Sequence, residues 1–240
     1  MKTHILLYFS FFFPASFNLA TAQTIEIIRK SDFQPDYRVN DFAFLEPVTD
    51  TTDIKFIATI KAIGVDKNVD IEQLYFKLKT RAQELGSNFF RLNSFSKSDS
   101  INTFILILDT YYGTDSALNR NFQNHEKNVI YIFGNAEKSD KTYSFKIDNT
   151  KKEINGGTFY KHQNKEGQEV KINKGGFSGA TIWVKWKENK PATFLTLTGF
   201  GLGGAPVPVG QIGISFNTGR INYIDGNLGH LLVLLLTQSE

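Results

Sequence analysis

Short apolar segments recur about every ten to twelve residues from residue 128 onward, and turn-forming residues separate them. No apolar stripe with helical spacing is found in this half of the sequence. In the clearest segment, Tyr143, Phe145 and Ile147 alternate with polar residues, which is typical of a half-buried strand whose apolar side points inward. The pattern predicts an all-β sandwich or open barrel over residues 128–240.

The strands expected in this half are short runs of apolar and β-branched residues. They are Val129–Phe133, Thr142–Asp148, a run around Phe159, Val170–Ile172, Thr181–Lys187, Ala192–Thr198, Ile212–Phe216, Ile221–Ile224 and Leu231–Leu236. The final run is far too short to span a membrane as a helix. We interpret it as a buried last strand.

One amphipathic helix is the strongest local signal in the first half of the sequence. Apolar residues recur with helical spacing from Ile71 to Leu85 and form one continuous stripe. Asp70 is a suitable N-cap, and Gly86 stands where a left-handed residue commonly ends a helix. We therefore predict a helix that begins after Asp70 and ends before Gly86.

Strands are predicted on both sides of this helix. Asp53–Ala62 alternates with a period of two, and Asn88–Phe95 follows the helix as a further strand. Thr103–Tyr112 contains an unbroken apolar run, which is typical of a central strand covered on both faces. The fold class expected is therefore α+β, with a small β-α-β-β module over residues 53–112 ahead of the β-rich second half.

The junction between the predicted helix and the next strand has the sequence AQELGSN, Ala82–Asn88. It resembles the A-x-x-L-G-A-N junction of YbjQ-like small α/β modules of bacteria, with Ser87 in place of the usual alanine. The resemblance covers residues 53–112 and implies the fold of such a module. It implies no functional residues.

A polar, Asn-rich stretch separates the two halves. Residues 113–127 are interpreted as a linker that contains at most one helical turn. The expected organisation is an α+β module over residues 23–112, with a short strand at Asp41–Leu45, and a β-sandwich-like domain over residues 128–240.

The first 22 residues have the three parts of a secretory signal. Lys2 supplies the positive start, Ile5–Phe17 the short apolar run, and Ala20-Thr21-Ala22 the small-x-small cleavage site. The alternative is a buried N-terminal strand or helix, which this Phe-rich block followed by A-x-A disfavours. We expect cleavage near Ala22 and a periplasmic or secreted protein with no transmembrane segment in the mature chain.

The chain contains no cysteine, so disulfides, thiolate metal sites and cysteine nucleophiles are excluded. Residues 127–190 hold thirteen lysines, no arginine and seven acidic residues. Arginine is the residue preferred for bidentate phosphate recognition, so nucleic acid is not an expected partner. An acidic surface, a polysaccharide or an envelope protein remains as a candidate partner for this basic half.

Two glycine motifs resemble catalytic signatures and lack the required context. Gly199–Gly204 matches G-x-G-x-x-G, but Pro206 and Pro208 prevent the helix that would hold a pyrophosphate. We interpret this segment as a turn, or as a mobile loop over a pocket, and take Gly201 and Gly203 as ligand-binding candidates. The segment 176–180 lacks the second glycine of a nucleophile elbow.

The histidines and carboxylates show no catalytic or metal-binding spacing. His125, His162 and His230 have no second histidine two or four residues away, so each is expected to be isolated: His162 solvated in a polar loop and His230 at the edge of a core. A metal site would have to be assembled from distant loops. We therefore predict no catalytic residue, no metal and no cofactor.

The sharpest binding candidate lies in the predicted strand Thr181–Lys187. Trp183, Lys185 and Lys187 fall on one side of it and the apolar residues on the other. An exposed tryptophan flanked by lysines is suited to stack on a sugar or to hold an anionic ligand. The alternative is that a neighbouring loop covers Trp183.

The leading hypothesis is an exported, non-enzymatic protein that binds a ligand or partner through its β-rich half. One alternative is a secreted hydrolase whose active site is built from loops. Another is an envelope scaffold in which the acidic first half docks on the basic second half or on a neighbour. Residues 31–70 carry eight acids against four bases, which gives this last alternative its charge complementarity.

Overall fold

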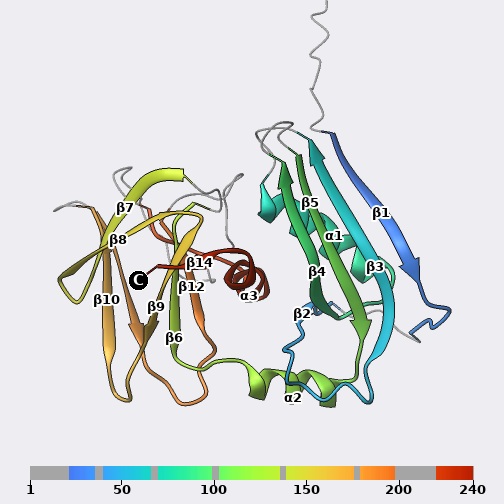
Figure 1. Ribbon diagram of the computed structural model, residues 1–240. Coiled ribbons are helices and arrows are strands. Elements are labelled where there is room, and N and C mark those ends of the chain that lie inside the picture. Colours follow the sequence, from blue (N-terminus) through green and yellow to red (C-terminus); the bar gives the residue numbers. More distant parts are fainter. Residues whose placement is uncertain are drawn as a thin grey trace, which may run out of the picture.

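The computed structural model describes residues 22–35, 40–65, 70–98, 103–135, 139–175, 179–197 and 220–239. These residues form three β-sheets and three helices (Figure 1). The predicted signal segment lies outside the described residues apart from Ala22, and the predicted strand Ile212–Phe216 and the two candidate glycines Gly201 and Gly203 lie outside them entirely.

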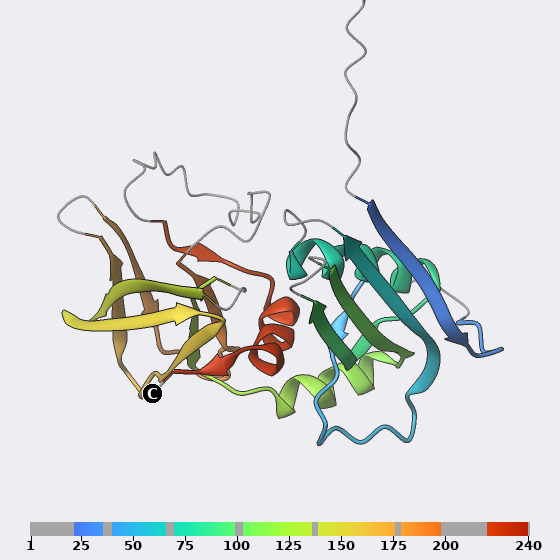
Figure 2. The same cartoon turned by 45° about the horizontal axis from the view of Figure 1, so that its top comes forward.

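The N-terminal half is a five-stranded sheet with a helix on one face. The elements are β1 (Ala22–Lys30), β2 (Ala43–Phe44), β3 (Lys55–Val65), α1 (Ile71–Glu84), β4 (Phe89–Ser98) and β5 (Thr103–Tyr112). The strand order is β1-β3-β5-β4-β2, and α1 lies across the sheet (Figure 2). The predicted β-α-β-β sequence of elements is therefore present, and β1 adds a strand that the sequence did not reveal.

Helix α1 begins and ends where its capping residues predict. The Asp70 carboxylate accepts a hydrogen bond from the Gln73 backbone N–H at 2.8 Å. After the helix, Gly86 adopts φ +87°, and a Cβ there would lie only 2.8 Å from Cγ of Pro35. The helix buries one continuous stripe against the sheet: Ile71, Leu74, Tyr75, Leu78 and Ala82.

Two details of the sheet differ from the sequence prediction. In the period-two pattern of Asp53–Ala62, Ile57 falls on the same side as Lys55 and Lys61, away from the core. A bulge between Phe56 and Ala58 in β3 breaks this alternation, and Ile57 is fully buried. Strand β5 is central, as predicted, but Ile105 and Ile107 are only half-buried. The helix therefore covers one face of this strand, and the prediction that both faces are covered is wrong.

The stretch between the halves is more ordered than a linker. Helix α2 (Asp115–Asn124) occupies most of it, with the Thr114 side chain as its N-cap. It buries Ala117 and Asn121. The prediction of a single helical turn missed this length because the Asn-rich sequence offers few apolar residues to mark a stripe.

The C-terminal half contains two sheets. Its strands are β6 (Val129–Phe133), β7 (Ser139–Ile147), β8 (Thr150–Gly156), β9 (Thr158–Gln163), β10 (Glu169–Lys174), β11 (Ala180–Lys185), β12 (Thr193–Thr196), β13 (Asn222–Tyr223) and β14 (Thr237–Gln238). One sheet has the order β11-β10-β7-β8 and the other the order β13-β12-β6-β9-β14, so neither closes into a barrel within the described residues. A shared core of side chains from both sheets lies between them, including Phe145, Ile172 and Leu195. The β-rich α+β class is confirmed.

The predicted last strand, Leu231–Leu236, is wrong, because residues Gly226–Leu235 form helix α3. Asp225 caps it by accepting hydrogen bonds from the backbone N–H groups of Asn227 and Leu228 at 2.9 and 3.0 Å. The sequence hides this helix because its residues are apolar on almost every side, which is typical of a helix packed on several faces.

Helix α3 lies between the N-terminal sheet and the five-stranded C-terminal sheet (Figure 1). Leu228, Leu231 and Leu232 belong to a buried core that also includes Phe44 of β2 and Phe133 of β6. None of the described helices is both long enough and apolar enough to cross a membrane. The two halves are thus joined by a common core as well as by the chain.

Substitution of two glycines of α3 tests how closely this helix must approach the sheet. A Cβ at Gly229 would lie 2.2 Å from the Phe194 ring, whereas a Cβ at Gly226 would meet nothing within 4 Å. We expect Gly229→Ala to lower the free energy of unfolding by about 2–3 kcal/mol through overpacking. Gly226→Ala should leave it unchanged or raise it by up to about 1 kcal/mol.

Urea denaturation followed by circular dichroism measures both variants against the parent chain. Equal stability of the two alanine variants would contradict the close packing of α3 on Phe194.

Candidate functional site

The tryptophan–lysine surface predicted from sequence is present on the outer face of the four-stranded sheet. Trp183 lies in the edge strand β11, and its side chain is 58% exposed. Its neighbour Val184 points to the opposite side and is buried. Within the described residues, no loop therefore covers Trp183, contrary to the alternative interpretation.

Lysines surround Trp183 on this face. Lys171 of β10 stands directly opposite Trp183 in the strand register, and Lys185 follows two residues later on the same side. Lys146 of β7 pairs with Asn173, the next outward residue of β10. All three lysines are exposed. We call Trp183, Lys185, Lys171 and Lys146 the outer-face cluster.

Lys187 is the second of the two lysines predicted for this face. It lies beyond the end of β11, where its backbone N–H donates to Oδ1 of Asn128 at 3.1 Å and its carbonyl accepts from the same side chain. The chain turns there, so strand alternation no longer decides where the Lys187 side chain points. The sequence pattern placed Lys185 on this face and missed Lys171 and Lys146, which neighbouring strands supply.

A second cluster lies where the two halves meet. Glu46 follows β2, His125 is the C-cap of α2, and His230 lies in α3. One carboxylate oxygen of Glu46 is 3.6 Å from Nδ1 of His230 and 3.8 Å from Nε2 of His125. The two imidazole rings are 4.4 Å apart between centroids. We call these three residues the junction triad.

Asn121 and Phe44 hold the triad in place. Oδ1 of Asn121 accepts from the Glu46 backbone N–H at 2.9 Å, and its Nδ2 donates to the Phe44 carbonyl at 2.8 Å. Nε2 of His125 lies 3.2 Å from that same carbonyl. The His230 ring stacks on the Phe44 ring with an interplanar angle of 5°. Buried hydrogen bonds of the Asn121 amide and packing of the aromatic rings therefore fix the position of all three side chains.

Burial makes both imidazoles neutral at neutral pH. Burial, helped by the nearby His125, lowers the pKa of His230 to about 4. Burial also lowers the pKa of His125. Burial and the neighbouring Glu126 raise the pKa of Glu46. The contacts between Glu46 and the two histidines are consequently not ion pairs between opposite charges.

Glu126 is a second carboxylate at this place and is already partnered. Lys161 donates to it at 2.6 Å, and the Tyr131 hydroxyl donates to its other oxygen. Burial raises the pKa of Glu126, but these two hydrogen bonds outweigh burial and hold the pKa below its ordinary value. Glu126 therefore stays ionised and adds negative potential near His230.

The sequence treated the histidines as isolated, and that prediction is wrong for two of them. Glu46 and His125 are 79 positions apart, and His125 and His230 are 105 positions apart. No short-range spacing in the sequence therefore indicates the triad. The third histidine, His162, also differs from its prediction. It lies on β9, and its Nε2 is buried without a hydrogen-bond partner among the described residues.

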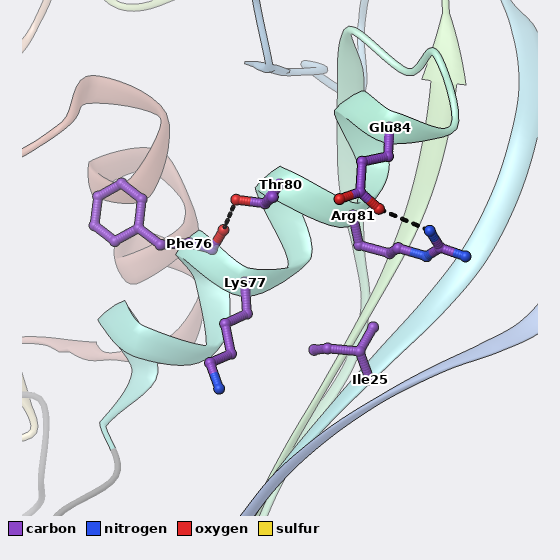
Figure 3. Close-up of a pocket in the computed structure, with 6 residues that line it drawn as sticks. All are labelled: Ile25, Phe76, Lys77, Thr80, Arg81 and Glu84. Carbon is purple, nitrogen blue, oxygen red and sulfur yellow. Dashed lines mark hydrogen bonds and ion pairs between the residues drawn. The ribbon is translucent and has the colours of Figure 1, made fainter. Parts of the chain in front are cut away.

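A shallow hollow on the outer side of α1 offers no converging catalytic groups (Figure 3). Its one carboxylate, Glu84, is paired with Arg81 of the same helix at 2.7 Å, and the Thr80 hydroxyl donates to the Phe76 carbonyl. Ile25 of β1 forms the opposite side. This hollow is separate from both clusters.

Comparison of the chain with known protein families, with characterised proteins and with solved structures finds no match. The resemblance of residues 53–112 to YbjQ-like modules stays a prediction.

Substitution of Asn121 tests how much its hydrogen bonds stabilise the junction between the two halves. Replacing it with alanine removes the acceptor of the Glu46 N–H and of the Thr49 hydroxyl, and one of the two side-chain nitrogens beside the Phe44 carbonyl. Each buried polar group left without its partner costs about 1–3 kcal/mol. We expect Asn121→Ala to lower the free energy of unfolding by about 2–4 kcal/mol in urea titrations. Asn124→Ala, in the same helix, loses a single bond to Thr49 at an exposed position and should cost less than about 1 kcal/mol. A cost for Asn124→Ala that equals the cost for Asn121→Ala would contradict this account.

Proposed function

We propose that this chain is an exported, non-enzymatic binding module whose outer-face cluster holds acidic polysaccharide. The observation that carries the proposal is the exposure of Trp183 on an edge strand with Lys171 directly opposite. A flat indole beside fixed positive charges offers a sugar ring a stacking surface and offers its carboxylate or sulfate a counter-charge.

The chemistry of the face favours a glycan over a nucleic acid. The cations are all lysines, which act as point charges, and no guanidinium is available for bidentate phosphate contacts. Glu169 stands opposite Lys185 in the register, and Lys151 is paired with Glu153 at 2.6 Å on the same sheet. The face is therefore mixed, with a modest positive excess, and suits a weakly charged polymer better than a dense polyanion.

The outer-face cluster also favours a binding role over the two alternatives. A secreted hydrolase needs a hollow with converging carboxylate, histidine or serine groups, and the hollow on α1 supplies only the paired Glu84. A scaffold formed by docking of the acidic half on the basic half needs an interface of charges. The described contact between the halves is instead a core of aromatic and leucine side chains around Phe44 and α3.

The proposal includes the organisation inferred from sequence. We infer an α+β module over residues 23–112 and a β-sandwich-like unit over residues 128–240 that presents the binding face. The shared core between the four- and five-stranded sheets supports the second unit. Export rests on the signal pattern of residues 1–22 and agrees with a polysaccharide partner outside the cytoplasm.

Intrinsic fluorescence tests the binding face directly, because the chain has two tryptophans. In the Trp186→Phe variant, Trp183 is the only indole, and titration with polygalacturonate should change its emission. Neutral dextran should change it less. Trp183→Ala should weaken binding of polygalacturonate about tenfold in calorimetry, since loss of stacking and cation–π contact is worth about 1–2 kcal/mol.

A pair of matched charge variants separates the face from general attraction. Lys171→Gln with Lys185→Gln should weaken binding and flatten its salt dependence. Lys30→Gln with Lys55→Gln removes the same charge from exposed sites of the N-terminal half and should leave the affinity within about twofold. Full affinity in Trp183→Ala, or equal losses in the two lysine pairs, would rule out this surface.

A further inference from the structure

We propose that the junction triad, Glu46, His125 and His230, binds one divalent transition-metal ion, of which zinc is the best match. One potential ligand atom from each of the three residues lies within 4.8 Å of the other two. Such an ion would join β2, α2 and α3 and so clamp the two halves of the chain together. This inference is independent of the proposed glycan-binding function.

The spacing of the ligand atoms fits a metal better than it fits direct hydrogen bonds. At 3.6 and 3.8 Å, the Glu46 contacts to His230 and His125 are too long for hydrogen bonds. Adjacent ligands of a tetrahedral zinc, with bonds of about 2.0–2.1 Å, are separated by about 3.3–3.4 Å. The two Glu46 distances therefore need to shorten by only a few tenths of an ångström, and the ligand atoms of the two histidines lie within 4.8 Å of each other.

The Glu46 carboxylate lacks a partner that would otherwise explain its burial. Only 19% of its side chain is exposed, and within the described residues it accepts no hydrogen bond. Arg91 is near, but it donates to the main-chain carbonyls of Leu45 and Glu46 at 3.2 and 2.9 Å. A half-buried carboxylate without a bonded partner is costly, and a cation in the gap would remove that cost.

The burial and the neutral state of the two histidines suit them to bind a metal ion. A metal needs the neutral imidazole, and both rings are more than four-fifths buried among aromatic side chains, with exposed side-chain fractions of 11% for His125 and 15% for His230. When Nε2 of His125 turns to the ion, the Phe44 carbonyl keeps Asn121 as its donor at 2.8 Å. The rearrangement thus leaves no buried carbonyl unpaired.

The chemical types of the three ligands limit which metal ions can bind. Two imidazoles and one carboxylate suit zinc and its neighbours in the first transition row, whereas calcium and magnesium prefer an all-oxygen set. The ionised Glu126 near His230 adds further negative potential. Three protein ligands leave one position of a tetrahedral ion for water.

The test uses the whole protein without a polyhistidine tag, stripped with EDTA and then dialysed. Calorimetry with zinc chloride should give one ion per chain, and zinc should raise the midpoint of thermal unfolding by about 5–10 °C at a hundredfold excess over Kd. Cobalt(II) chloride should produce visible d–d absorption bands that zinc then removes. Absence of one-to-one binding would overturn the proposal.

Three variants place the ion. His230→Gln and Glu46→Gln should each weaken zinc binding at least tenfold and reduce the thermal shift. His162→Gln removes the one other histidine of the described residues and should keep the parent affinity. If His230→Gln fails to fold, Glu46→Gln decides alone, because Glu46 loses no hydrogen bond in that change. Parent affinity in folded Glu46→Gln, or loss of binding in His162→Gln, would overturn the junction triad as the site.

Discussion

The burial of α3 between the two halves is the constraint on which the rest of the structure depends. This helix inserts leucines into a core that contains aromatic rings from β2 and β6, and Gly229 brings its backbone against Phe194. The amide of Asn227 accepts a hydrogen bond from the Phe44 backbone N–H at 2.9 Å and so ties the helix to β2. Without α3, the apolar faces of both sheets at this junction would meet water, at roughly 25 cal/mol per Å² of exposed apolar area.

The sequence predicted those elements whose boundaries and buried sides are determined by residues close together in the chain. The stripe of α1 and its caps at Asp70 and Gly86 act within a few residues of one another, so the sequence alone places this helix. The alternation of Tyr143, Phe145 and Ile147 likewise fixed the inward side of β7. Strands β6 and β5 begin and end at the residues predicted for them.

The parts that escaped prediction have causes that are distant in the sequence. Helix α3 was taken for a strand because a helix covered on several sides needs no polar face, which leaves no period to detect. The bulge at Ile57 depends on pairing with β5, and the lysines around Trp183 come from three strands. The junction triad needs three elements to meet, and only the packing of α3 on Phe44 brings His230 to Glu46. The sequence indicated Trp183 and Lys185 of the outer-face cluster and no member of the junction triad.

The bond between Phe44 and Asn227 also governs when the chain can acquire its final shape. Its two partners are 183 positions apart. During synthesis, the N-terminal sheet emerges long before the helix that must cover its edge. Contacts of such high sequence separation slow folding, because the entropy of closing a large loop is lost before the contact forms. The apolar edge of the first half that α3 covers therefore stays exposed until the residues of α3 have been added to the chain.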